Sequence, residues 1–170
     1  MSGAEVLLVT GSRALADTAA ALRWTRAAIL RAVADCMERT DRVRVVVGDA
    51  AGGDEEAEAL ASSLNVRYPG VTFSVFRLSG LVVHEDRPNE RWTGEEAPSR
   101  GSAESRRWPL KRNAAMVARV ARMPRASVLA LKAPWSKTDG TGHTAGLAAA
   151  AGLVVVRLEC PSELGPQRKR

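Results

Sequence analysis

Five short runs of mainly apolar residues recur along the chain, and each has the length of a β-strand. They are residues 5–10, 43–47, 71–78, 127–131 and 153–158. Most of these runs are apolar at nearly every position rather than at alternate ones, which indicates strands that are buried on both faces. Such strands are typical of a parallel sheet that is covered by helices on both sides.

The segments between these runs have the spacing of amphipathic helices. Within residues 17–39, one helix face carries Leu22, Ile29, Val33 and Cys36. Further helices are expected over residues 54–64, from Pro109 to about residue 122, and over residues 140–151. Pro109 suits the first turn of a helix, because a backbone N–H has no partner there. The alternation of strand and helix predicts a doubly wound α/β sheet.

The length of 170 residues predicts one domain, over residues 1–160, followed by a basic tail at 161–170. Residues 79 to about 107 interrupt the alternation with Gly, Pro, Ser and charges of both signs, which predicts a long loop insertion. Trp92 lies in this loop. It is either part of a lid that stacks on the base of a ligand or a single anchor for the loop, and the anchor is favoured.

Net charge and hydropathy limit the partners and the cellular compartment that we expect for the protein. The formal net charge is +6, and Arg168, Lys169 and Arg170 contribute half of it, so nucleic acid is a possible partner through the tail. No stretch approaches the roughly 18 apolar residues of a membrane span, and the start lacks the pattern of a signal peptide. We therefore expect a cytoplasmic protein with no membrane partner. Cys36 and Cys160 are too few for a disulfide framework, and Cys36 is expected in the core.

Three glycine-bearing turns follow three of the apolar runs: Val9–Arg13, Gly48–Asp54 and Gly140–Thr144. A glycine-rich turn between a strand and a helix exposes backbone N–H groups, which bind phosphates and other polar groups. Three such turns in one small domain predict a shared ligand cleft at the carboxyl ends of the strands. The chain has neither the Gly-x-Gly-x-x-Gly dinucleotide fingerprint nor a Walker-type Gly-Lys-Ser/Thr.

The three turns differ in charge, and so in the part of a ligand that each suits. The first and third turns suit a phosphate, or at the first turn a carboxylate, through Thr10, Gly11, Ser12, Arg13, Gly140, Thr141, Gly142 and Thr144. The second turn is acidic and would repel a phosphate, so it suits ribose hydroxyls or base N–H groups. Its candidate residues are Gly48, Asp49, Gly52, Gly53 and Asp54. Alternatively, Asp54 is the N-cap of the following helix.

A fourth candidate element is the basic segment that follows Pro109. Lys111, Arg112 and Asn113 are expected in the first turns of that helix, where cations oppose the helix dipole. A locally unfavourable pair of cations indicates an anionic ligand, although side chains that extend into solvent would explain it at little cost. No metal site and no cofactor are expected, because the acidic turn has no His or Cys nearby.

Taken in order, these motifs resemble the YspA-like branch (DUF2493) of the SLOG superfamily. The motifs are Val-Thr-Gly-Ser-Arg, a glycine-rich loop ending in Gly-x-Asp, Pro-x-x-Arg-Asn-x-x-Met, and Gly-Thr-x-x-Thr before a small-residue helix. The superfamily also contains the Lonely Guy phosphoribohydrolases and the DNA-processing protein A family. The resemblance implies a Rossmann-like sheet of strand order 3-2-1-4-5, a nucleotide or nucleotide-derived ligand, and a homodimer.

The chain departs from the enzymes of that superfamily at one position. Lonely Guy enzymes carry a catalytic Glu where this sequence has Thr144, so the carboxylate that would stabilise an oxocarbenium-like transition state is missing. The leading hypothesis is therefore a nucleotide-binding sensor or ligand-binding module. The alternatives are a hydrolase of N-glycosidic or phosphoester bonds, with Asp54 and then Asp49 as acid/base candidates, and a single-stranded nucleic-acid-binding protein.

Overall fold

The computed structural model describes residues 3–48, 52–67, 69–76, 82–84 and 103–167. Six strands form one sheet: β1 (Glu5–Gly11), β2 (Val43–Val47), β3 (Val71–Phe76), β4 (Val82–His84), β5 (Ala126–Lys132) and β6 (Val154–Glu159). The helices are α1 (Ala19–Met37), α2 (Gly53–Arg67), α3 (Ala103–Val120) and α4 (Gly140–Ala150). Two short 3-10 helices, η1 (Arg13–Asp17) and η2 (Ser162–Leu164), complete the described elements.

The sheet has the order β4-β3-β2-β1-β5-β6. All neighbouring pairs are parallel except β3 and β4, which are antiparallel. The five parallel strands confirm the predicted α/β sheet and its 3-2-1-4-5 order. The sixth strand, β4, was not predicted, because three residues are too short a run to stand out within a polar segment.

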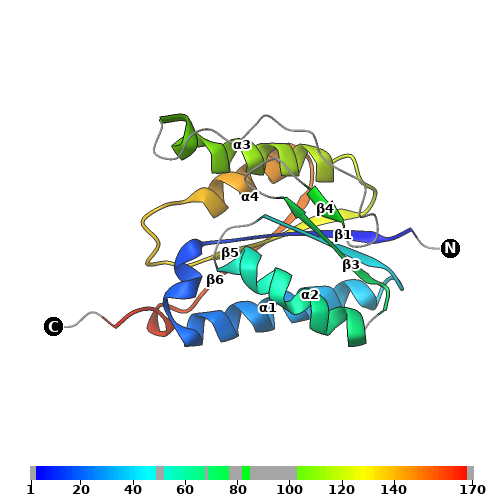
Figure 1. Ribbon diagram of the computed structural model, residues 1–170, viewed down its shortest axis with the longest axis horizontal. Coiled ribbons are helices and arrows are strands. Elements are labelled where there is room, and N and C mark those ends of the chain that lie inside the picture. The colour runs from blue at the N-terminus through cyan, green and yellow to red at the C-terminus, as the bar shows by residue number, and fades with distance from the viewer. Residues whose placement is uncertain (1–2, 49–51, 68, 77–81, 85–102, 168–170) are drawn as a thin grey trace.

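Helices cover the sheet on both faces, as predicted: α1 and α2 on one, α3 and α4 on the other (Figure 1). Strand β1 shows why its residues are apolar throughout. Leu7 and Val9 belong to the core beneath α1 and α2, whereas Val6 and Leu8 belong to the core beneath α3 and α4. Because successive side chains of a strand point to opposite faces, a central strand between two helical layers needs apolar residues at every position.

Helix α3 begins earlier than predicted. It starts at Ala103, so Pro109 lies inside the helix and not in its first turn. Lys111, Arg112 and Asn113 are therefore in the middle of the helix, and the dipole at a helix start does not act on them. Residues 82–84 and 103–107, within the predicted loop of 79–107, form β4 and the beginning of α3. The other residues of that loop, Trp92 included, lie outside the described residues.

Cys36 and Cys160 are both buried in the core beneath α1, which confirms the prediction for Cys36. Burial and the neighbouring Glu5 carboxylate raise the pKa of the Cys36 thiol to about 11. The thiol therefore stays protonated at neutral pH and is a poor nucleophile. Among the described helices, none combines the length and the apolar character needed to cross a membrane.

Glu5 and Arg39 join the start of β1 to the residues that follow α1. Arg39 Nε donates to Glu5 Oε1 at 2.9 Å and Arg39 Nη2 donates to Glu5 Oε2 at 2.7 Å, which makes a bidentate pair. These hydrogen bonds lower the pKa of the mostly buried Glu5 carboxyl below its ordinary value, although burial alone would raise it. A lowered pKa in the folded state stabilises the fold above the unfolded pKa, and this contribution is lost as the pH falls.

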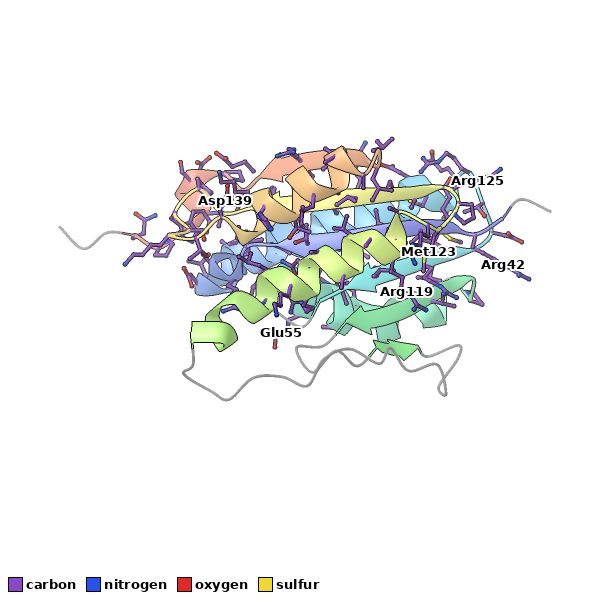
Figure 2. All side chains as sticks on the ribbon, turned by 90° about the horizontal axis from the view of Figure 1, so that it is seen from above. Arg42, Glu55, Arg119, Met123, Arg125 and Asp139 are labelled. Carbon is purple, nitrogen blue, oxygen red and sulfur yellow. The ribbon has the colours of Figure 1, made fainter. Side chains whose placement is uncertain are left out.

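Arg39→Ala is therefore expected to move acid unfolding to a higher pH. Without the guanidinium, the ionised Glu5 carboxylate loses its partner and with it the stabilisation that goes with the lowered pKa, so the protein is less stable at neutral pH and less acid is needed to unfold it. Circular dichroism during an acid titration measures the midpoint. Arg42→Ala is the matched control, because Arg42 is exposed at the same end of the sheet (Figure 2). Equal midpoints for Arg39→Ala and the unchanged chain would contradict the assignment.

Candidate functional site

A cavity of about 440 Å³ opens at the carboxyl ends of β1 and β5. The chain crosses from one side of β1 to the other between these two strands, and ligands of open α/β sheets bind at such a switch point. Asp139 marks this end of the molecule, opposite Arg42 and Arg125 (Figure 2). The lining residues are Thr10, Gly11, Ser12, Arg13, Asp54, Pro109, Leu110, Arg112, Asn113, Thr138, Asp139, Gly140, Thr141 and His143.

Ser12 ties the first turn to β5 and α4. Its backbone N–H donates to Leu131 O at 2.9 Å, and its hydroxyl oxygen accepts the N–H of Ala133 at 3.1 Å. The same oxygen lies 3.5 Å from Thr141 Oγ1, and both side chains are buried. Ser12 thus fixes the shape of the cleft floor, and its backbone N–H is already used within the protein.

The glycines of the first and second turns pack against each other. A Cβ atom on Gly11 would lie 2.7 Å from Gly53 Cα, and one on Gly53 would lie 2.8 Å from Gly11 Cα. Gly52 has φ +85°, and a side chain there would also meet the carbonyl oxygen of Ser12. These three glycines therefore allow the start of α2 to approach the end of β1, which a larger residue would prevent.

A buried ion pair forms part of the cleft wall. Asp54 is in the first turn of α2, which begins at Gly53, so the alternative of Asp54 as the N-cap is wrong. Its Oδ2 lies 3.9 Å from Arg112 Nη2, and the two side chains are 2% and 4% exposed. A side chain on Gly48, which follows β2, would meet both charged groups. The glycine at this position makes room for the ion pair.

Hydrogen bonds continue from this ion pair to α4. Nε and Nη2 of Arg112 donate to Asn113 Oδ1 at 3.0 and 2.7 Å. Asn113 Nδ2 donates to Thr144 Oγ1 at 2.9 Å, and the Thr144 hydroxyl donates to Gly140 O at 2.9 Å. Arg112, Asn113 and Thr144 are all buried. The chain of contacts holds α2, α3 and α4 in one arrangement around the cleft.

A carboxylate of the protein itself lies beside the third turn. Asp139 is the N-cap of α4, and its Oδ1 accepts the N–H of Gly142 at 3.1 Å. A carboxylate at a helix start occupies the place that suits a phosphate. The expectation that this turn is an anion site is weakened, because a phosphate here would meet the negative charge of Asp139.

The structure brings nine of the predicted ligand residues to the wall of one cleft. They are Thr10, Gly11, Ser12, Arg13, Asp54, Arg112, Asn113, Gly140 and Thr141. Six others do not line it: Gly48, Gly52 and Gly53 pack behind it, Lys111 is exposed on α3, and Gly142 and Thr144 lie within α4. Asp49 lies outside the described residues.

Sequence reasoning missed Pro109, Leu110, Thr138 and Asp139 as cleft residues. An Asp directly before the first residue of a helix is a frequent N-cap, so the sequence could have placed Asp139 at the start of α4. No sequence pattern could have placed Leu110 in the cleft, since an apolar helical residue is ordinarily expected in the core. It is 41% exposed. Within the part of the chain that the structure describes, no cluster of three His, Cys, Asp or Glu side chains is placed to hold a metal ion.

Comparisons with models of known protein families and with curated proteins find no match for this chain.

Proposed function

We propose that the protein binds a nucleotide or nucleotide-derived ligand in the cleft at the carboxyl ends of β1 and β5, as a sensor or ligand-binding module. The observation that carries this proposal is the cleft itself: about 440 Å³ at the switch point of a parallel sheet, lined by polar side chains. Cavities of roughly 300–1,000 Å³ suit small-molecule ligands. The resemblance of the four motifs to the SLOG superfamily supports the same ligand class.

The charges of the cleft favour a ligand with a single phosphate. Arg13 and Arg112 line the cleft together with Asp54 and Asp139, so the formal charges of these four side chains cancel. Arg112 is buried beside Asp54, whereas Arg13 is exposed. Arg13 is accordingly the side chain that we assign to the phosphate. A triphosphate would add more negative charge than this cleft balances.

The cleft also has residues that can contact the base and the ribose of a nucleotide. Pro109 and Leu110 form an apolar part of the wall, against which a base can rest. Asp139 offers a carboxylate that can accept a hydrogen bond from a ribose hydroxyl. The ligand class that fits best is a nucleoside monophosphate or a nucleotide sugar of similar charge.

Binding is favoured over hydrolysis by the arrangement around Thr144. Its hydroxyl donates to Gly140 O and accepts from Asn113, and a hydroxyl cannot replace a carboxylate in stabilising a cationic transition state. Asp54, the acid/base candidate that the structure describes, is buried beside a guanidinium. Its carboxylate is 2% exposed and lies against Arg112, which leaves it little access to a reacting group.

Arg13→Ala is expected to weaken AMP binding at least about tenfold, because a charge-assisted hydrogen bond contributes roughly 1.5–3 kcal/mol. Isothermal titration calorimetry with AMP, ADP-ribose and cyclic nucleotides measures the affinity. Arg23→Ala is the matched control, since Arg23 is an exposed arginine on α1 that does not line the cleft. Its affinity should equal that of the unchanged chain.

Two results would overturn the proposal. One is the absence of binding by every member of the nucleotide panel. The other is an affinity that Arg13→Ala leaves unchanged. Chromatography of the same mixtures tests the hydrolase alternative, because release of free base with repeated turnover would identify an enzyme instead of a binding module.

A further inference from the structure

The side chain that we assign to the phosphate, Arg13, is the first residue of a helix with little support of its own. Helix η1 has only five residues, and the side chain of its N-cap residue Ser12 makes no capping hydrogen bond. The Ser12 hydroxyl oxygen accepts the N–H of Ala133 instead. Short 3-10 helices also have poorer hydrogen-bond geometry than α-helices. The position of Arg13 therefore depends on the residues that pack against η1.

Two contacts fix η1 to the rest of the protein. The side chain of Leu15 is fully buried in the core beneath α1. The indole N–H of Trp135 donates to the backbone carbonyl oxygen of Ala14 at 3.1 Å. Because Ala14 and Leu15 are adjacent, these two contacts together oppose a turn of η1 about its axis. They act on the two residues that directly follow Arg13, which lines the cleft.

The indole of Trp135 is itself held by the C-terminal segment, residues 160–165. A Cβ atom on Gly165 would lie 2.6 Å from Trp135 Cε3, so the backbone of this glycine rests against the ring. The same segment also reaches the N-cap residue of α1, since Thr18 Oγ1 donates to the carbonyl oxygen of Leu164 at 2.5 Å. Figure 1 shows the segment, in red, beside the blue start of α1. Trp135 therefore contacts η1 and the C-terminal segment at once.

Trp135 belongs to the connection between β5 and α4, residues 133–139. This connection also supplies Thr138 and Asp139 to the wall of the nucleotide cleft. It thus acts on two sides of the cleft, because it contributes Asp139 directly and reaches Arg13 through Trp135 and η1. Trp135 itself does not line the cleft.

We propose that Trp135 is a positioning residue for the phosphate of the ligand. Its hydrogen bond to Ala14 holds η1, and with it Arg13, in the orientation that binds the phosphate. The inference rests on the proposed nucleotide-binding function and adds to it a residue outside the cleft lining. A group that is already held in its binding orientation loses less conformational freedom when the ligand binds. Gly165 contributes through Trp135, because it packs against the indole ring.

Calorimetric titration of Trp135→Phe with AMP tests the inference. Phenylalanine keeps an aromatic ring but has no N–H for Ala14, so the affinity for AMP is expected to fall about three- to tenfold, the range for one lost hydrogen bond. In an Arg13→Ala background the same substitution should have less than about a twofold effect, because the residue that it positions is already absent. A merely structural role would weaken AMP binding in both backgrounds.

Trp24→Phe is the matched control for the loss of an indole. Trp24 is partly buried and packs against the same core as Trp135, but it does not line the nucleotide cleft. Its affinity for AMP should equal that of the unchanged chain. Thermal unfolding of each variant establishes that the titrated protein is folded.

Two further measurements reach the same contact by other routes. Gly165→Ala places a methyl group against the indole and should also weaken AMP binding, although residue 165 does not line the cleft. Nuclear magnetic resonance measures how fast the Trp135 indole N–H exchanges with solvent, and this needs no substitution at Trp135. AMP should slow the exchange in the unchanged chain but not in Arg13→Ala, because coupling between two contacts acts equally in both directions.

The inference is overturned if Trp135→Phe binds AMP as tightly as the unchanged chain does, or if its effect is the same in the Arg13→Ala background. It is equally overturned if AMP leaves the exchange of the indole N–H unchanged. None of these results affects the proposed function when the unchanged chain binds AMP through Arg13. If AMP does not bind at all, this inference fails, whereas the proposed function fails only when no member of the nucleotide panel binds.

Discussion

Replacing Arg112 with methionine should destabilise the protein by about 3–5 kcal/mol, the usual cost of removing one member of a buried ion pair. The reason is the position of its guanidinium, 3.9 Å from Asp54 Oδ2 with both side chains almost fully buried. The substitution also removes two hydrogen bonds to Asn113 Oδ1. Urea unfolding followed by circular dichroism measures the free energy of unfolding.

A double variant makes this prediction specific. Arg112→Met combined with Asp54→Leu should recover most of the lost stability, because apolar residues can replace a buried ion pair at little cost. Arg122→Ala is the control for loss of an exposed arginine just beyond α3, and it should change the free energy of unfolding by about 0.5 kcal/mol or less. If Arg112→Met alone proved as stable as the double variant, the ion pair would not be an important contact.

The position of Arg112 also decides how ligand binding should be tested. Arg112 lines the cleft, but its removal disturbs α2, α3 and α4 at once through Asp54, Asn113 and Thr144. Loss of nucleotide binding in an Arg112 variant would therefore not distinguish a lost contact from an altered cleft. Arg13 is exposed and makes the cleaner variant.

Gly53→Ala should destabilise the protein by about 1–3 kcal/mol, the range for overpacking in a close-packed interior. Its Cβ atom would lie 2.8 Å from Gly11 Cα, so backbone would have to move rather than a flexible side chain. Thermal unfolding should show a lower midpoint for Gly53→Ala. Gly11→Ala should behave similarly, because it crowds the same contact from the other side.

Gly146→Ala is the matched control and should act in the opposite direction. Gly146 lies inside α4, and apart from its chain neighbours and the nearby backbone of its own helix, a Cβ atom there would have no atom within 4 Å. Alanine in a helix interior is favoured over glycine by roughly 0.5–1 kcal/mol. If Gly53→Ala had the same thermal unfolding midpoint as the unchanged chain, the first and second glycine-bearing turns could move apart without loss of stability.

The alternation of strands and helices was predictable because two signals agree: strands buried on both faces need continuous apolar runs, and the helices between them need a different period. The order of the parallel strands was expected from the resemblance of the motifs and not from these runs. The ends of the elements were less predictable. Pro109 is typical of a helix start, yet α3 begins at Ala103 and continues through Pro109.

The grouping of the site residues was predictable, but the reason for several glycines was not. A turn after a parallel strand must lie at the carboxyl edge of the sheet, which brings Gly11, Asp54 and Gly140 together. The approach of Gly53 to Gly11 joins residues far apart in the chain, and no local pattern encodes it. These two glycines appeared suited to a ligand, but they allow two segments of the protein's own backbone to approach each other.

The position of β1 in the sheet has a consequence for biosynthesis. Strand β1 lies between β2 and β5, and β5 begins only at Ala126. On the ribosome, β1, β2 and α1 can associate while the second side of β1 is still without its neighbour. One side of β1 in the nascent chain therefore has no neighbouring strand until β5 emerges.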